Sequence, residues 1–101
     1  MNLEEHKTRE QLQQECAPIV YKEIEQFFAR GMIVIVSKEL DILDVALIIQ
    51  ADNSDELEKL IGQKQVTRAH DDHAIKWSQE NSMLMAITAV PWLLVQEINT
   101  K

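Results

Sequence analysis

The sequence predicts an α+β fold in which a small sheet of two or three strands packs with about five helices. The first observation is the β-branched run at 32–36, and the second is the apolar segment 84–98, which Pro91 divides. The third is a set of stretches whose apolar residues recur at helical spacing. Because 101 residues match the usual size of one domain, residues 1–101 are predicted to form a single α+β domain.

The N-terminal part is predicted to be helical. Residues 3–15 are good helix formers but offer only Leu3 and Leu12 to a core, so 1–16 are expected to contain a peripheral helix. Pro18 suits the first turn of a second helix, and Gly31 is placed to end that helix by adopting a positive φ. The apolar face of this second helix is expected to consist of Ile19, Val20, Ile24, Phe27 and Phe28.

A buried strand and an apolar helix are predicted next. The run 32–36 has no polar alternation, which is typical of an interior strand that is covered on both faces. Asp41 is placed to cap a helix over 42–51, and the apolar residues of this helix surround most of its circumference. Such a helix needs cover on more than one side.

A short helix and a weak strand follow. Asn53 and Glu56 have the spacing of a capping box, and Gly62 is placed to end the helix that they begin. Residues 64–68 favour a short strand or an extended connector, although few apolar residues support it.

The polar cluster His70, Asp71, Asp72 and His73 is predicted to begin a fifth helix, which ends near Asn81 and Ser82. The side chains that this helix is expected to turn toward the interior are Ala74, Ile75 and Trp77. His70 and His73 would lie one turn apart, so with Asp71 they are the candidate metal ligands. The spacing matches no specific zinc signature, and helix capping and the helix dipole also explain the aspartates.

The apolar segment 84–98 is predicted to be buried in a soluble fold rather than to cross a membrane. A spanning helix needs about twenty apolar residues, whereas this segment is interrupted by Pro91 and reaches Glu97. Residues 84–90 favour a strand, and Pro91 is expected where the ladder ends or bends, because it has no amide donor. Residues 92–98 fit a strand or a helix that begins at Pro91, and their Leu and Val run favours the strand.

Charge and composition exclude several classes of partner. The chain has 10 basic and 17 acidic residues, a net charge of −7, and its cations are scattered, so neither nucleic acid nor an anionic membrane is an expected partner. The N-terminal residues lack the basic and apolar regions of a secretory signal, which predicts a cytoplasmic location. Cys16 is the single cysteine, so no intramolecular disulfide forms.

Catalytic motifs are not recognisable in the sequence. No serine lies in a nucleophile elbow, and two glycines provide no loop that cradles a phosphate. Asp41 and Asp44 are spaced as paired carboxylates, but the favoured explanation is a helix cap and its solvated neighbour. The chain is therefore predicted not to be an enzyme, and no cofactor is implied.

Self-association is the expected consequence of so much apolar sequence in a short chain. Two continuous apolar strands and an apolar helix need cover, and a second copy is expected to supply it in a homo-oligomer, most simply a dimer. The candidate interface residues are Ile48, Met83, Met85, Trp92 and Leu93. The alternatives are that these residues fill the core and that the helices of one copy suffice.

The segments FFARGMIVIV, LDILDVALIIQADN, AIKW and VPWLLVQE resemble a small bacterial family called domain of unknown function 2288, over roughly Ile19 to Glu97. The resemblance implies a cytosolic bacterial protein of about this length and transfers no catalytic residue. The sequence thus predicts a non-enzymatic cytosolic accessory or regulatory protein that acts through self-association and binding of an unknown protein partner. The alternative is a small-ligand or metal-binding protein, even an enzyme, that uses the His70–His73 cluster.

Overall fold

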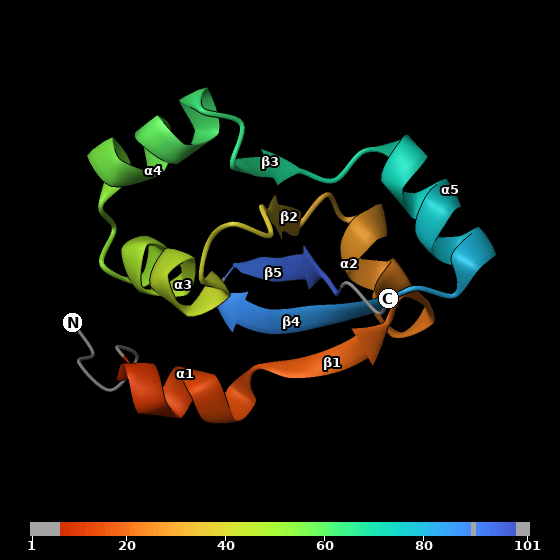
Figure 1. The fold of residues 1–101 in the computed structure, drawn as a ribbon, viewed down its shortest axis with the longest axis horizontal. Coiled ribbons are helices and arrows are strands. Elements are labelled where there is room, and N and C mark those ends of the chain that lie inside the picture. The colour runs from red at the N-terminus through yellow and green to blue at the C-terminus, as the bar shows by residue number, and fades with distance from the viewer. Residues whose placement is uncertain (1–6, 90, 99–101) are drawn as a thin grey trace.

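A five-stranded sheet with helices packed around it forms the molecule (Figure 1). The computed structural model describes residues 7–89 and 91–98. The helices within these residues are α1 (Arg9–Glu15), the 3₁₀ helix η2 (Tyr21–Ile24), α2 (Glu25–Ala29), α3 (Ile42–Gln50), α4 (Ser54–Gly62) and α5 (Asp71–Glu80). The strands are β1 (Ala17–Val20), β2 (Ile33–Val36), β3 (Val66–Arg68), β4 (Met83–Ala89) and β5 (Trp92–Glu97).

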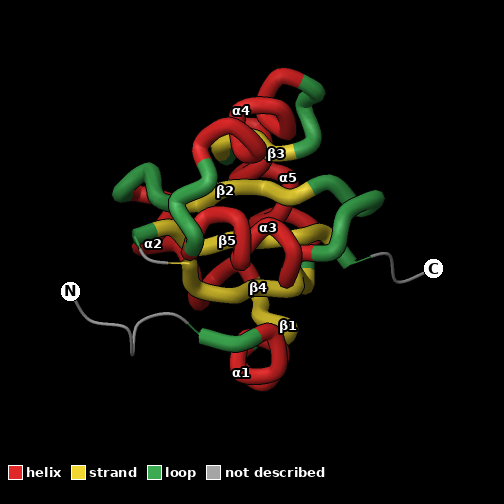
Figure 2. The backbone as a smooth tube through the Cα atoms, turned by 90° about the vertical axis from the view of Figure 1, so that its left-hand side faces the viewer, coloured by secondary structure: helices red, strands yellow, loops and turns green. Residues whose placement is uncertain are grey.

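The sheet has the strand order β1-β4-β5-β2-β3, which Figure 2 shows from bottom to top. The β2–β5 pair is parallel and the other pairs are antiparallel. The predicted α+β class is confirmed, but the predicted sheet of two or three strands was too small. All four predicted strand segments are strands, and the fifth strand, β1, lies where a helix was predicted.

The segment Ala17–Val20 is an edge strand and does not belong to the helix predicted to begin at Pro18. The amide of Tyr21 donates to the Ser82 carbonyl at 3.3 Å, so Tyr21 faces β4. Every second residue before it in the antiparallel register also faces β4, which leaves the backbone nitrogen of Pro18 on the free edge. Proline has no amide to donate there, so the ladder loses no hydrogen bond. The helical residues that follow are confined to η2 and α2.

Side chains alternate between two apolar cores, one on each face of the sheet. Val34, Val36 and Leu94 join the core beneath α1, α3 and α4, whereas Ile33 and Leu93 join the core that η2 and α5 cover. In Figure 1, α3 and α4 lie at the left of the sheet and α2 and α5 lie at the right. The predicted interior strand 32–36 is therefore confirmed, since β2 has a strand on either side and a core on both faces.

The helix α3 begins where predicted, with the Asp41 side chain accepting the Leu43 amide at 2.9 Å. Its residues Ile42, Leu43, Val45 and Ala46 are buried, and the helix packs against α1, α4, β4 and β5. The carboxamide of Gln96 donates to the carbonyls of Ser37 and Leu40, at 2.7 Å each, and ties the connection before α3 to the central strand. These contacts fix the position of α3 relative to β5.

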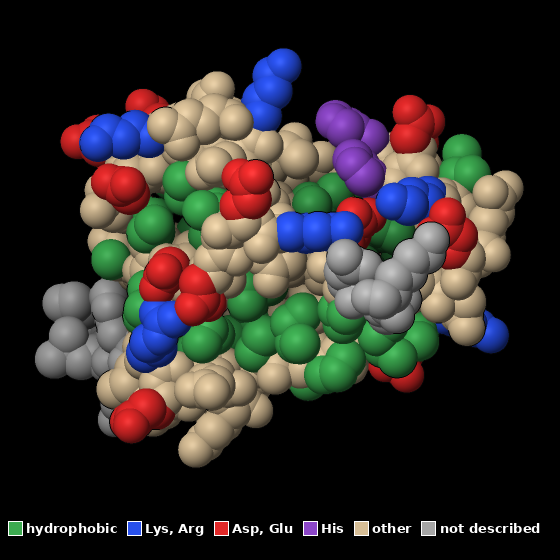
Figure 3. Space-filling view, viewed as in Figure 1, with side chains coloured by type: hydrophobic (Ala, Val, Ile, Leu, Met, Phe, Trp, Pro, Cys, Tyr) green, Lys and Arg blue, Asp and Glu red, His purple; other side chains and the backbone are tan. Residues whose placement is uncertain are grey.

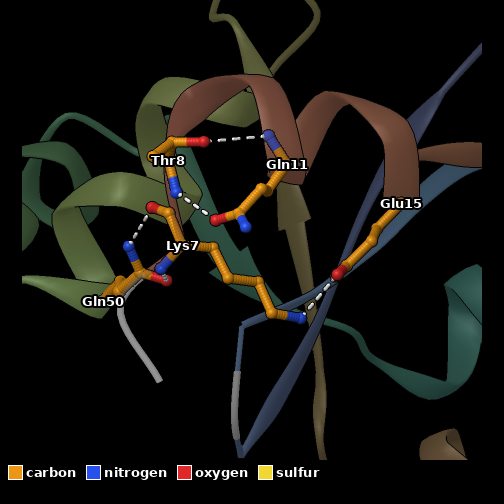
Figure 4. A network of polar contacts seen from close by, with 5 residues as sticks. All are labelled: Lys7, Thr8, Gln11, Glu15 and Gln50. Atoms are coloured by element: carbon orange, nitrogen blue, oxygen red, sulfur yellow. Dashed lines mark hydrogen bonds and ion pairs between the residues drawn. The ribbon is translucent and has the colours of Figure 1, made fainter. Parts of the chain in front are cut away.

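The helix α1 is attached by one apolar residue and a polar network (Figure 4). Leu12 is buried in the core beneath α3, and the hydroxyl of Thr8 accepts the Gln11 amide at 3.2 Å. The backbone amide of Lys7 donates to the Gln50 side chain at 2.8 Å, which joins the start of α1 to the end of α3. The helix is peripheral within residues 9–15, and residues 3–6 of the predicted helix lie outside the described residues.

One turn and one helix face differ from expectation. Gly31 has a φ of 70°, as predicted, but α4 ends with Lys64 in the left-handed region at a φ of 62°, while Gly62 is its last helical residue. In α5, Trp77 is fully buried and Ala74 packs beside it, whereas Ile75 is 54% exposed. Residues two apart on a helix do not share a face, so Ile75 and Trp77 cannot both point inward.

The C-terminal apolar segment is a β-hairpin whose second strand is the centre of the sheet. Pro91 is exposed in the turn between β4 and β5, where it costs the ladder no bond, and the favoured strand assignment for 92–98 is confirmed for Trp92–Glu97. Within the described ranges, none of the helices has the length and apolar character needed to span a bilayer.

Candidate functional site

An apolar groove opens between α4 and β3 and is the candidate binding site. Its volume is about 430 Å³, and it is named here the α4–β3 groove. Its lining residues are Val34, Ile49, Leu57, Ile61, Lys64, Val66, Thr67, Arg68 and Trp92. Figure 3 shows hydrophobic side chains reaching the surface between α3 and α4.

Regular spacing in α4 and β3, and the packing of Trp92, place the groove walls. Leu57 and Ile61 are four residues apart on α4 and so lie on one face of that helix. Val66 and Arg68 are two residues apart on β3 and so point to the same face of the sheet. Trp92, at the start of β5, packs against the core beneath α3. The groove is thus a part of this sheet face, next to β3, that α4 does not cover completely.

Two cations lie among the groove residues, on a chain whose net charge is −7. The Arg68 guanidinium carbon lies 5.0 Å from the centre of the Trp92 ring, in a cation–π arrangement. Its Nη2 donates to the Gly31 carbonyl at 3.1 Å, which fixes the guanidinium from a second direction. Lys64 occupies the left-handed turn that joins α4 to β3. No Asp or Glu is among the described residues that line the groove.

The predicted metal ligands form the beginning of α5. The imidazole Nδ1 of His73 accepts the backbone amide of His70 at 2.9 Å, and the two rings stack with their centres 5.6 Å apart. Asp71 is the first residue of the helix and is exposed, as the dipole explanation requires. Within the described part of the chain, no group of three or more His, Cys, Asp or Glu side chains is arranged to hold a metal ion.

The predicted interface residues lie in different environments. Met83 is 42% exposed at the start of β4, and Ile48, Met85 and Trp92 are half-buried. Leu93 is only 6% exposed and belongs to the core beneath α5. The structure therefore leaves four of the five candidates accessible to a partner, and Trp92 alone among them lines the groove.

The carboxylate pair Asp41 and Asp44, considered above for acid–base chemistry, binds the Arg9 guanidinium. Arg9 Nη1 pairs with Asp44 and Nη2 with Asp41, and the hydrogen bond to Asp44 is the main reason that the pKa of Arg9 is raised. Partial burial raises the pKa of the Cys16 thiol, which disfavours the thiolate that a nucleophile needs. These groups are thus explained without catalysis.

A hydrogen-bonded pair that the sequence did not reveal, the buried Trp77 and the half-buried Glu97, joins α5 to β5. The Trp77 indole Nε1 donates to Glu97 Oε2 at 3.0 Å, and Lys76 Nζ lies 3.5 Å from the same oxygen. The indole hydrogen bond is the largest of the influences that lower the pKa of Glu97, and the charge of Lys76 adds to it. Because both partners of Glu97, the Trp77 indole and the Lys76 ammonium, lie on α5, these contacts hold α5 against β5 and stabilise the fold.

The fold and the groove define the class as an α+β domain with a mixed five-stranded sheet, helices on both faces and an apolar groove near one edge. The chain belongs to the family described as protein of unknown function (DUF2288), whose model matches residues 7–97. The resemblance noted in the sequence is confirmed, and the match extends it from Ile19 back to Lys7.

A solved structure is similar to this chain. It is the NMR solution structure of PA1075 from Pseudomonas aeruginosa, with 27% sequence identity and a TM-score of 0.79. The similarity covers 87% of this chain and 82% of PA1075. Comparison with curated proteins gives no match.

Proposed function

We propose that this chain is a non-catalytic, cytoplasmic binding protein with an accessory or regulatory role, and that the α4–β3 groove is its recognition site. The observation that carries the proposal is the groove itself, an apolar concavity of about 430 Å³ at the edge of the sheet. Small-molecule sites in proteins usually measure about 300–1,000 Å³, are lined by apolar side chains and contain a few polar groups that fix orientation.

The composition of the groove supports binding rather than chemistry. Its walls are aliphatic and aromatic, and its charged groups are a lysine and an arginine at the turn and the edge strand. Among the described residues, the candidate acids and bases outside it are engaged elsewhere: Asp41 and Asp44 with Arg9, His73 with the His70 amide, and Glu97 with Trp77. Binding is therefore the function that this arrangement supports best.

Replacing Ile61 with aspartate is expected to weaken apolar binding in the groove without unfolding the protein. Ile61 is 52% exposed, so the change should alter the free energy of unfolding by no more than about 0.5 kcal/mol. A charge on the groove wall should lower the affinity for a neutral solvatochromic dye such as Nile red at least about tenfold, because the dye would contact a hydrated carboxylate. Dye fluorescence titrations provide the measurement.

The matched control for this experiment is Ile75→Asp. Ile75 is 54% exposed on α5 and is not a groove residue, so it introduces the same charge on an equally exposed isoleucine. Its dye affinity should equal that of the unchanged protein. Equal dye affinity in all three proteins would show that the groove does not bind apolar molecules.

Self-association is a second proposed function, and the open edge at β3 favours it. The Ser37 amide donates to the Gln65 carbonyl, and the Ala69 amide donates to the Ile33 carbonyl. In an antiparallel pair every second residue faces the partner strand, so the backbone groups of Val66 and Arg68 point away from β2. This edge carries no proline, unlike β1. We propose a dimer in which two β3 strands pair, which leaves the groove open on the face of the sheet.

The dimer is tested by mass and by amide exchange at micromolar concentration. Light scattering should give twice the 11.7 kDa of one chain. The amides of Val66 and Arg68 should be protected from hydrogen exchange in the dimer and should lose this protection on dilution. A mass of one chain with rapid exchange at both amides would refute pairing through β3.

A further inference from the structure

We propose that the ligand of the α4–β3 groove is a small amphiphilic anion, an apolar chain or ring that carries a single carboxylate. The inference rests on the proposed binding function of the groove and specifies the chemistry of what it binds. The apolar part would lie against Leu57, Ile61 and Trp92, and the carboxylate would lie between Lys64 and Arg68 at the mouth.

The local charge is opposite to that of the molecule. The chain carries 17 acidic residues against 10 basic ones, yet both charged residues of the groove are cations. Within the described residues, neither Lys64 nor Arg68 forms an ion pair within 4.0 Å. An anion in the groove would supply the missing counter-charge, whereas a cation would be repelled.

Arg68 is held in a position suited to a carboxylate. The Trp92 ring lies under the guanidinium at 5.0 Å, and the Gly31 carbonyl accepts one of its hydrogen bonds. A guanidinium has five N–H donors in a rigid fork, and among the described residues this one bond to Gly31 is its single hydrogen bond. The remaining donors match the two oxygens of a carboxylate, and less side-chain entropy is lost because the group is already fixed.

Lys64 is held beside the groove by the turn that ends α4. Its amide donates to the Ile61 carbonyl at 3.0 Å, and the next amide, of Gln65, donates to the Leu60 carbonyl at 2.9 Å. The left-handed conformation of Lys64 between these bonds sets the direction of its side chain near the groove. Two cations beside apolar walls suit one anionic head on an apolar body better than a polyphosphate, which would need more donors.

Octanoate and 1-octanol, which differ in the headgroup, test the proposal in a titration of the ¹⁵N-labelled full chain. Below the concentrations at which either forms micelles, both should shift the Trp92 indole resonance and the amides of residues 64–68. At low ionic strength octanoate should bind roughly three- to tenfold more tightly than octanol, and added salt should reduce this preference.

Charge-removing variants locate the preference. Lys64→Gln with Arg68→Gln should lower the affinity for octanoate to that for octanol, and Lys64→Gln alone should lower it partly while Arg68 keeps its contacts with Trp92. The control is Lys22→Gln with Arg30→Gln, which changes the net charge equally at exposed residues outside the groove and should preserve the preference.

Each other outcome overturns the proposal in a recognisable way. Equal affinities for octanoate and octanol would refute the anionic ligand while leaving the apolar binding function intact. If neither probe shifted the groove resonances, both the anionic ligand and the binding function of the groove would be refuted. The amides of β3 are expected to shift on dilution through strand pairing alone, but a shift of the Trp92 indole resonance on dilution, without a probe, would show that a second copy occupies the groove and would likewise refute the ligand.

Discussion

Replacing Trp77 with alanine is expected to lower the free energy of unfolding by roughly 3–5 kcal/mol. Trp77 is fully buried between α5 and the sheet, where its ring lies 5.7 Å from that of Tyr21, and the change would leave a cavity and remove the indole hydrogen bond to Glu97. Since domains are typically stable by about 5–15 kcal/mol, the variant should be partly or wholly unfolded. Urea denaturation followed by far-ultraviolet circular dichroism measures the loss.

The variant Trp77→Phe separates ring packing from the hydrogen bond to Glu97. In the unchanged protein the folded-state pKa of Glu97 is lowered, so its stabilisation is complete above the unfolded-state pKa and is lost as the pH falls through the folded-state pKa. Phenylalanine keeps most of the ring but has no N–H, so the loss of stability on acidification should be smaller. An alanine variant as stable as the unchanged protein would contradict the packing described here.

Replacing Leu93 with aspartate is expected to unfold the protein. Leu93 lies in the central strand and is 6% exposed, so the carboxylate would be buried without a partner in the core that contains Trp77 and Val95. A buried charge that lacks its partner typically costs at least about 3–5 kcal/mol. Loss of the dispersed amide resonances in a ¹H–¹⁵N spectrum would show the unfolding.

Thr88→Asp provides the control for Leu93→Asp. Thr88 pairs with Leu93 across the β4–β5 ladder, so its side chain is on the same face of the sheet, but it is exposed. The same charge should therefore be tolerated at Thr88. If Leu93→Asp were folded and merely monomeric, Leu93 would be an interface residue, as the sequence suggested, and the burial of β5 within one copy would be wrong.

The sequence predicted the elements with a strong period and missed the one without. The run 32–36 has enough consecutive apolar residues to indicate a strand that is buried on both faces. The helix α3 has a capping residue and enough apolar residues at helical spacing to be recognised. Residues 17–20 are too few to distinguish a strand from a helical turn, and Pro18 suits both an edge and a first turn. What makes them a strand is pairing with β4, where Ala17 lies opposite Ala86, and local sequence cannot report so distant a partner.

The groove was not predicted from the sequence. Trp92 was predicted as an interface residue, and residues 64–68 were the weakest strand prediction because few apolar residues lie there. Neither the approach of Arg68 to Trp92 nor the hydrogen bond from Trp77 to Glu97 follows from spacing, since each joins segments that pair only in the folded sheet. The His70–His73 cluster was conspicuous in sequence because helix starts concentrate polar residues.

The order of strands in space has a consequence for synthesis. β5 is the last strand in chain order, yet it lies between β4 and β2. During synthesis, β2 and β4 therefore leave the ribosome before β5, and their edges that pair with β5 stay unpaired until residue 97 has emerged. Folding is then limited by contacts between distant segments, and apolar surface stays exposed until those contacts form.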